Sequence, residues 1–363
     1  MGEDLILVCN EIWLNKPADL ADPRAQLQAL RGRTRKTPES SGLFSTEICI
    51  KQRITEVPQG YRFEERGIQV TTLHDSMRIS GTTRLAGIMG WPVAHSRSPV
   101  LHGFWLDETG VDGAYLPLPV RPRHIEQALR ALPILGFGGC NLTIPHKQAA
   151  LAVVDRVEPL ARRIGAVNTI VIGPDGMLEG RNTDAFGFCE SLRDAVPAWK
   201  ATAGPAAILG AGGAARALVA ALADAGVTEI RMVNRTLARA EAVAGDLATP
   251  NTRITIHAWE EVGAALRHAG LLVNATSLGM AGEPALTLDL APLPPSAPVV
   301  DIVYIPLETD LLATARRRGH PVVDGLGMLM HQGRPGFEAW FGTPVRVTHE
   351  LRAAILATLA PAR

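Results

Sequence analysis

A glycine-rich turn is the first stretch of the sequence whose residues could do chemistry. It reads Gly210-Ala-Gly212-Gly-Ala-Ala215 and lies between an apolar segment and an amphipathic one. In such a turn the first glycine permits a tight bend, the second lets backbone approach a pyrophosphate, and a small third residue allows a helix to pack closely on a strand. The N–H groups at the helix start also attract phosphates. We therefore predict that residues 206–239 form a βαβ unit that binds a dinucleotide through Gly210, Ala211, Gly212, Gly213 and Ala214; a glycine turn without a ligand is the alternative.

The loop after the second strand of this unit indicates which dinucleotide to expect. A site for NAD usually places an acidic residue there, which accepts from the ribose 2′-hydroxyl. This chain instead has Asn234, Arg235, Thr236 and Arg239. Two guanidinium groups and a hydroxyl suit a 2′-phosphate, so the sequence favours NADP over NAD. The alternative is a solvated basic turn at the end of a strand.

A lysine and an aspartate form the second candidate set. Lys147 follows Asn141-Leu-Thr143-Ile-Pro-His, and the proline indicates that a helix starts there. In the first helical turn, the positive end of the helix dipole and partial burial would both make the ammonium group a readier proton donor near neutral pH. Asp184 opens a later helix, and its carboxylate could orient the lysine across a cleft. The alternatives are a solvated lysine and an aspartate that only caps its helix.

Three smaller polar side chains lie at junctions between loops and regular elements. Ser96 and Ser98 stand at the start of a helix, where a hydroxyl either caps the helix or helps the free N–H groups to bind a carboxylate. Asn168 lies in a turn of small residues, where an exposed amide could recognise hydroxyl groups. His95 and His146 have no cysteine or carboxylate at ligand spacing, so we predict no metal site.

Loops in the second half of the chain leave strands at their carboxyl ends, where open α/β sheets bind ligands. Two such loops follow Asn274 and Asp301, and the second carries the aromatic hydroxyl of Tyr304. A helix that starts near Gly325 carries the amide of Gln332 facing back. We assign to the cofactor site the residues Thr276, Ser277, Met280, Ile302 and Gly325.

The elements that must position these residues alternate between strands and helices from Thr83 onward. Apolar runs of strand length are separated by helical stretches and short turns, which is typical of α/β domains with mostly parallel sheets. A length of 363 residues fits about two such domains. We predict an α/β substrate-binding domain at residues 81–190 and a Rossmann-type NADP-binding domain at residues 191–327. Helices within residues 328–363 are expected to pack back on the first domain.

Three segments have sequence patterns that are typical of strands or of a hairpin. Tyr115–Val120 contains two prolines, which cannot donate to a neighbouring strand, so we expect it at the edge of a sheet. The turn Pro174-Asp-Gly176 between two apolar segments predicts a hairpin. Val299–Tyr304 is expected to be a strand of the second domain.

Residues 1–80 differ from the rest of the chain. The segment 31–46 is polar and basic, and no helical or strand period runs through the region, as in a poorly ordered extension. Met77 opens a natural beginning for the folded part. We therefore predict that the first 76 residues are dispensable for activity; a regulatory or partner-binding arm is the alternative.

Composition and charge exclude several kinds of partner. Lys plus Arg and Asp plus Glu number 36 each, so neither nucleic acid nor an anionic membrane is expected. The four cysteines form no C-x-x-C pair, which fits reduced thiols in the cytoplasm. No apolar run reaches the length of about 18 residues that a membrane span needs. The N-terminus has acids where a signal peptide needs basic residues.

Together these motifs resemble the shikimate dehydrogenase family of the pathway to aromatic amino acids. The resemblance spans about Thr83 to Leu359 and rests on S-R-S-P, N-L-T-I-P-H-K, G-A-V-N-T, N-T-D, G-A-G-G-A, N-R-T-x-x-R, N-A-T-S-x-G-M and D-I-V-Y-x-P. It implies that Ser96, Ser98 and Tyr304 hold a substrate carboxylate, and that Lys147 and Asp184 are the catalytic pair. The ring hydroxyl groups would be contacted by Thr143, Lys147, Asn168, Asp184 and Gln332.

The resemblance implies reversible reduction of 3-dehydroshikimate to shikimate by NADPH, in a monomer or homodimer whose substrate lobe closes against the NADP lobe. The sequence departs from the family at two places. Gln148 stands where many relatives have a glutamate, and Gly333-Arg334 stand where small apolar residues are usual, which would loosen the helix at Gln332. Alternatives are a quinate or dual-substrate dehydrogenase, another NADP-dependent reductase of this fold, and a non-catalytic NADP(H)-binding sensor.

Overall fold

The computed structural model describes residues 7–9, 12–14, 49–50 and 79–359. The chain divides into two compact units, Met1–Arg78 and Ile79–Arg363. In the first unit the described residues form three short antiparallel strands, with β1 (Leu7–Cys9) between β2 (Ile12–Leu14) and β3 (Cys49–Ile50). Apart from these strands and residues 79–80, the extension predicted over residues 1–80 lies outside the described residues.

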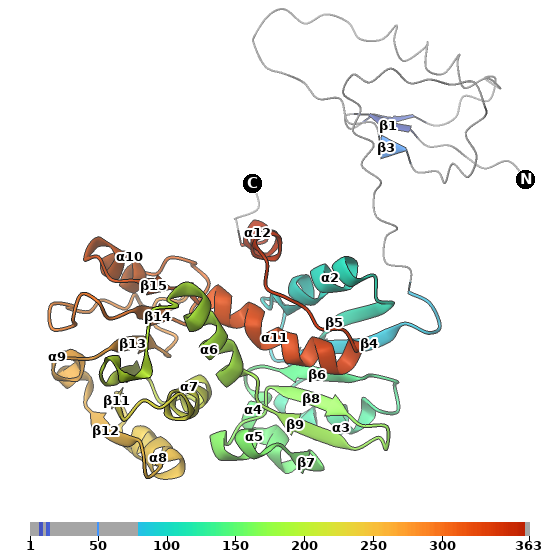
Figure 1. Cartoon of the computed structure of the whole chain (residues 1–363). Coiled ribbons are helices and arrows are strands. Elements are labelled where there is room, and N and C mark those ends of the chain that lie inside the picture. Colours follow the sequence, from blue (N-terminus) through green and yellow to red (C-terminus); the bar gives the residue numbers. More distant parts are fainter. Residues whose placement is uncertain (1–6, 10–11, 15–48, 51–78, 360–363) are drawn as a thin grey trace, which may run out of the picture. The chain divides into compact units, whose positions relative to one another are not determined.

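The second unit contains two six-stranded sheets, and the first has the order β5-β4-β6-β8-β9-β7 (Figure 1). Three neighbouring pairs are parallel, and the pairs β6–β8 and β8–β9 are antiparallel. The predicted hairpin forms at Pro174-Asp-Gly176, where Gly176 has a φ of 74°. The strands are β4 (Arg84–Gly90), β5 (Gly113–Pro119), β6 (Gly139–Leu142), β7 (Arg156–Val157), β8 (Thr169–Ile172) and β9 (Leu178–Arg181).

The prolines of the segment predicted as an edge strand do lie at an edge. Pro117 and Pro119 belong to β5, which pairs only with β4 in this sheet. The helices that follow the strands of the first sheet begin close to a proline in three of four cases. They are α2 (Ser98–Thr109), α3 (Ile125–Ala131), α4 (His146–Ala149) and α5 (Pro159–Ile164).

The second sheet is parallel throughout and has the order β12-β11-β10-β13-β14-β15. This is the strand order of a dinucleotide-binding fold, with its switch point between β10 and β13. Its central strands are apolar runs because both faces are covered; all four residues of β10 are fully buried. The strands are β10 (Ala206–Leu209), β11 (Glu229–Val233), β12 (Arg253–His257), β13 (Leu271–Asn274), β14 (Val299–Asp301) and β15 (Val322–Val323). The helices are α7 (Gly213–Asp224), α8 (Leu237–Leu247), α9 (Val262–Leu266) and α10 (Asp310–Arg317).

Strand β14 is shorter than predicted, since it ends at Asp301 and not at Tyr304. The carboxylate of Asp301 accepts from the N–H of Val303 at 3.0 Å. In a continued strand this N–H would donate to a neighbouring strand. Because it donates to the side chain of Asp301 instead, the backbone leaves the sheet after Asp301. Tyr304 is thereby placed in the loop beyond the sheet.

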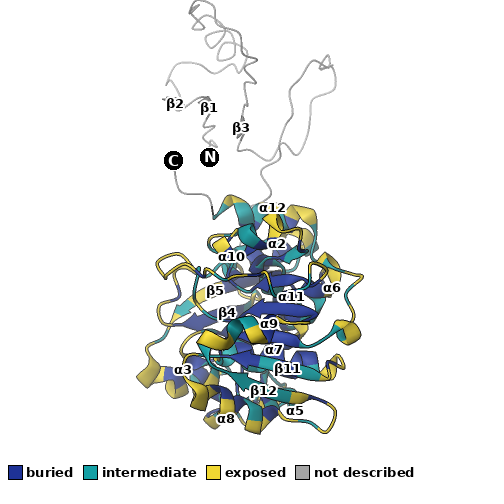
Figure 2. Cartoon of the chain, turned by 90° about the vertical axis from the view of Figure 1, so that its left-hand side faces the viewer, coloured by how far each residue is buried: buried dark blue, intermediate teal, exposed yellow. Residues whose placement is uncertain are grey.

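Two long helices connect the sheets. Helix α6 (Asp184–Ala195) leads from the first sheet to the second, and α11 (Gly325–Phe341) returns beside it (Figure 1). Helix α12 (His349–Ala357) then packs on α2. Figure 2 shows buried residues in the sheets and exposed ones on outer helices such as α3 and α8. None of the described helices is long and apolar enough to cross a membrane.

Candidate active site

A cavity of about 790 Å³ lies where the carboxyl ends of strands from both sheets meet. The first sheet contributes the loops after β4 and β6, and the second contributes the turn after β10 and the loop after β14. Among the predicted site residues, the cavity wall contains Ser96, Ser98, Thr143, Lys147, Asp184, Ala211, Gly212, Gly213, Ala214, Arg239, Ile302, Tyr304, Gly325 and Gln332. The glycine turn after β10 and the pair Lys147 and Asp184 therefore line the same cavity.

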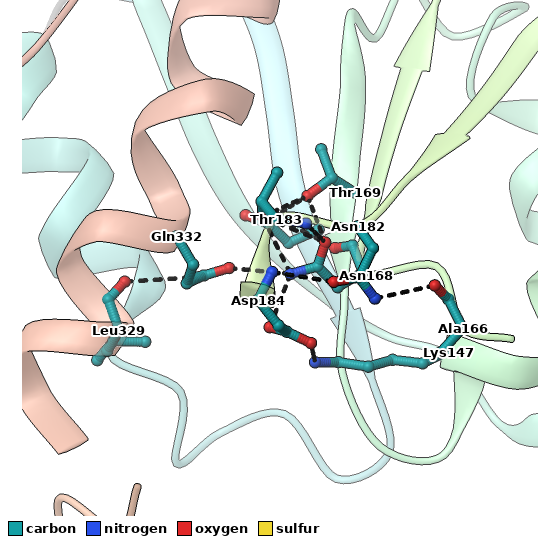
Figure 3. A network of polar contacts seen from close by, with 10 residues as sticks. Lys147, Ala166, Asn168, Thr169, Asn182, Thr183, Asp184, Leu329 and Gln332 are labelled. Atoms are coloured by element: carbon teal, nitrogen blue, oxygen red, sulfur yellow. Dashed lines mark hydrogen bonds and ion pairs between the residues drawn. The ribbon is translucent and has the colours of Figure 1, made fainter. Parts of the chain in front are cut away.

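The lysine and the aspartate form an ion pair on this wall. Nζ of Lys147 lies 2.6 Å from Oδ2 of Asp184, and the side chains are 25% and 7% exposed. Figure 3 shows the two side chains pointing at each other. The helix dipole argument is weaker than the sequence suggested, because α4 has only four residues. What holds the ammonium group is the charge-assisted hydrogen bond that it donates to the buried carboxylate of Asp184.

Asn168 supports this pair from behind. The expectation of an exposed amide is wrong: Asn168 is 1% exposed and lies beneath the cavity wall. Its amide nitrogen donates to Oδ1 of Asp184 at 2.8 Å and to Oε1 of Gln332 at 3.2 Å (Figure 3). The small residues around it, which suggested exposure, allow close packing instead. Any contact of Asn168 with a ligand has to share the amide with these two side chains.

The two serines and Tyr304 lie at another part of the wall. The hydroxyl of Ser96 accepts from the N–H of Ser98 at 3.2 Å, so it serves the start of α2 as a cap does. Burial raises the pKa of Tyr304, and the nearby positive charge of Arg97 opposes this shift. Arg97 also donates to the carbonyl of Thr358 at 3.1 Å, which joins the loop to the end of α12. The corner thus combines hydroxyl groups with a guanidinium group held close by.

The glycine turn has the space that a pyrophosphate needs. Gly210 has a φ of 104°, and a Cβ there would lie 3.0 Å from the carbonyl oxygen of Ala275. A Cβ on Gly212 or Gly213 would meet nothing within 4 Å, so these residues face open space. Helix α7 begins at Gly213 and directs its N-terminus there. The residues present fit a bound dinucleotide.

Some of the predicted cofactor residues lie outside the cavity wall. Arg235 and Thr236 are exposed on the loop after β11, one helical turn before the wall residue Arg239. The amide of Asn234 donates to the carbonyl of Thr236 at 2.7 Å, which fixes the shape of this loop. Gly210 lies beneath the wall, and the loop after β13 carries the other predicted residues, Thr276, Ser277 and Met280.

Sequence reasoning missed a buried network under the second sheet's loops. The amide of Asn274 donates to Oδ1 of Asp301 at 2.9 Å, and the hydroxyl of Thr309 donates to Oδ2 at 2.7 Å. Burial raises the pKa of Asp301, and the hydroxyl and amide donors oppose this shift. The available signal was that both residues end adjacent parallel strands, where they pair in register. The network holds the loops that begin at Thr276 and Ile302.

The second departure from the family is accommodated by packing and does not interrupt the helix. A Cβ on Gly333 would lie 2.9 Å from Leu101, so a glycine fits this close approach of α11 to α2. The guanidinium of Arg334 lies 5.5 Å from the ring centre of Phe186 and donates to the carbonyl of Val345 at 3.1 Å. Arg334 therefore joins α11 to α6. Gln148, the first departure, is an exposed residue of the cavity wall.

A dinucleotide-type sheet that faces a polar pocket across one cavity defines a two-lobed α/β protein of dehydrogenase architecture. Comparison with known families agrees. A family described as "Shikimate dehydrogenase substrate binding domain" matches residues 88–170. A second, described as "Shikimate / quinate 5-dehydrogenase", matches residues 197–283.

Individual relatives cover nearly all of the second unit. The chain is 60% identical over 278 residues to "Shikimate dehydrogenase (NADP(+))" of Paramagnetospirillum magneticum, which covers 77% of this chain and 100% of the relative. The chain therefore belongs to the shikimate dehydrogenase family. A solved shikimate 5-dehydrogenase from Thermus thermophilus in complex with NADP(H) and shikimate has a TM-score of 0.67 and 38% identity, over 76% of this chain and 99% of that one. Quinate dehydrogenase from Corynebacterium glutamicum in complex with NAD has a TM-score of 0.70 and 31% identity, with the same coverage.

Proposed function

We propose that this protein is an NADP-dependent shikimate dehydrogenase that reversibly reduces 3-dehydroshikimate to shikimate. The observation that carries the proposal is the single cavity that joins the Lys147–Asp184 ion pair to the glycine turn after β10. Hydride transfer requires the cofactor and a proton donor to reach one substrate carbon and its oxygen, and this arrangement supplies both sides. The relatives named for this reaction support it.

The chain's own residues would bind the substrate and move one proton. NADPH, when bound at the glycine turn, supplies the hydride. Lys147 Nζ gives its proton to the carbonyl oxygen, which becomes the new hydroxyl, and recovers a proton from solvent through its exposed fraction. Asp184 orients the ammonium group. Ser96, Ser98 and Tyr304 would hold the carboxylate, while Thr143 and Gln332 would contact ring hydroxyl groups, with Asn168 placed behind them.

This assignment divides the chain by role. We propose that residues 81–190, together with the helices in residues 328–363, bind the substrate, and that residues 191–327 bind NADP. The free thiols of Cys140 and Cys189 support a cytoplasmic location. A monomer or homodimer is the assembly proposed.

A spectrophotometric assay of the reduced nicotinamide tests the proposed function. Shikimate and quinate are each tried against NADP and NAD. We expect the highest kcat/KM for shikimate with NADP. A higher kcat/KM on quinate would identify a quinate dehydrogenase, for which the solved relative in complex with NAD is a precedent. Bound NADP without turnover of either substrate would indicate a sensor.

Reversing the charge after β11 should change the cofactor preference. We expect Arg235→Asp to raise KM for NADP by about 10–100-fold, because a charge-assisted hydrogen bond to the 2′-phosphate is lost. KM for NAD should change by less than about threefold, since NAD has a hydroxyl at that position. Arg253→Asp is the matched control, because Arg253 is an exposed arginine at the amino end of neighbouring β12. Equal losses for NADP and NAD would contradict a 2′-phosphate contact.

A further inference from the structure

A line of buried hydrogen bonds runs under the cavity and ends at the catalytic carboxylate. It starts on the edge strand, where the hydroxyl of Tyr115 lies 2.6 Å from Oδ1 of Asn141. The amide nitrogen of Asn141 then lies 3.1 Å from the hydroxyl of Thr169, which lies 2.9 Å from Oδ1 of Asn168. The amide nitrogen of Asn168 reaches Oδ1 of Asp184 at 2.8 Å. No motif assigned a role to the first three of these residues.

Backbone groups of fixed polarity set the direction of this line. The N–H of Thr183 can only donate, and it lies 2.8 Å from Oδ1 of Asn168, so the amide nitrogen of Asn168 must face Asp184. The backbone carbonyl of Asn168 can only accept, and it lies 3.3 Å from the side-chain nitrogen of Asn141. Oδ1 of Asn141 must therefore accept from Tyr115. Every member donates toward Asp184, an arrangement in which successive hydrogen bonds strengthen one another.

The strands explain how residues so distant in sequence meet. Asn141 and Thr169 pair in register across β6 and β8, so both side chains lie on one face of the sheet. Tyr115 pairs with Ala86 on β4, and this small side chain leaves room for the tyrosine ring to extend toward β6. The ring is stacked on His102 at 3.9 Å between centroids. Tyr115 is held from one side by an aromatic ring and at its hydroxyl by Asn141.

We propose that Thr169 is a positioning residue for the catalytic pair, with Asn141 and Tyr115 behind it. Its hydroxyl accepts from one amide and donates to the next, so it is the link at which the line is most easily broken. Without that hydroxyl, the amide of Asn168 loses one of the donors that fix its rotation, and its hydrogen bond to Asp184 weakens. The inference rests on the proposed function, because the effect is read from the turnover of shikimate.

The test compares Thr169→Val with Thr169→Ser in the full-length protein. We expect Thr169→Val, which keeps the shape and removes the hydroxyl, to lower kcat for shikimate about tenfold and change KM less than about twofold. Thr169→Ser keeps the hydroxyl and should recover most of kcat. Thr252→Val is the matched control, because Thr252 is equally buried but donates to the backbone carbonyl of Val227, next to the second sheet and away from the catalytic pair. Its kcat should equal that of the wild type.

Three results would overturn the proposal: equal kcat in wild type and Thr169→Val, an equal fall in both Thr169 variants, or a rise in KM alone. Should Thr169→Val fail to fold, Tyr115→Phe decides, since it keeps the ring on His102 and removes only the first donor. We expect a fall in kcat of about threefold there, and an unchanged kcat would overturn the proposal. A wild type that does not oxidise shikimate would instead contradict the proposed function.

Discussion

Lys147→Ala is expected to lower kcat by about 10²–10⁴-fold, the range for loss of a general acid–base group. In the proposed reaction the ammonium group is the proton donor, and the structure places it in an ion pair on the cavity wall with Nζ 2.6 Å from Asp184. Alanine leaves no group to protonate the alkoxide that forms at the ring carbon. KM for shikimate should change much less, because the residues proposed to hold the substrate carboxylate, Ser96, Ser98 and Tyr304, are untouched.

Steady-state kinetics with saturating NADP measures this effect. Lys200→Ala serves as the control, since Lys200 is an exposed lysine outside the cavity wall. Asp184→Asn keeps a group of the same shape and removes the charge, and it should also lower kcat. If KM rose while kcat stayed the same in Lys147→Ala, the lysine would only bind substrate, and the proton would have to come from elsewhere.

The fold should lose about 2 kcal/mol of stability between pH 7.5 and pH 5 through one histidine. Burial lowers the pKa of His102 to about 3 from the ordinary value of 6.5, and this effect outweighs the opposing influence of the nearby Asn141 side chain. Both ring nitrogens are buried without a hydrogen-bond partner in the described part of the chain. The unfolded chain therefore takes up a proton below pH 6.5 that the folded protein takes up only near pH 3. Stability from this group is fully present above pH 6.5 and is lost as the pH falls toward 3.

Urea unfolding at pH 7.5 and pH 5 measures this loss, with His102→Leu as the comparison. Leucine is apolar and cannot be protonated, so the variant should lose about 2 kcal/mol less than the wild type over this interval. Other groups contribute equally to both proteins and cancel in the difference. Above pH 7.5 the two proteins should show the same pH dependence. If the wild type and the variant lost equal stability between pH 7.5 and pH 5, the claim that the His102 imidazole is buried in its neutral form would be contradicted.

The parts of the fold that the sequence predicted depend on local signals. The glycine turn at Gly210 and the proline-containing edge strand are set by the conformations of single residues, so they can be recognised without knowing what packs on them. The same holds for the hairpin at Gly176. The NADP preference likewise followed from residues that adjoin in sequence.

The misjudged parts depend on contacts between distant segments. Asn168 was expected to be exposed because its neighbours are small, but α11 brings Gln332 against it. Asp301 ends its strand early because its carboxylate, held in place by Asn274 and Thr309, accepts from the N–H of Val303. Arg334 was expected to loosen a helix, and its partners in α6 and near Val345 hold it instead. No local pattern contains these partners.

The return of α11 and α12 to the first sheet also bears on how the chain folds during synthesis. The core of the first lobe places Trp105 at 5.5 Å from Phe337 between ring centroids, and Trp340 donates to the carbonyl of Ile170 at 2.9 Å. Residues 84–181 leave the ribosome well before α11, which carries these aromatic partners. The second lobe is formed by the contiguous residues 206–323, so its strands and helices are made one after another. Although domains generally fold in the order of synthesis, here we expect the second lobe to be complete first, with the first lobe finished only once α11 has been made.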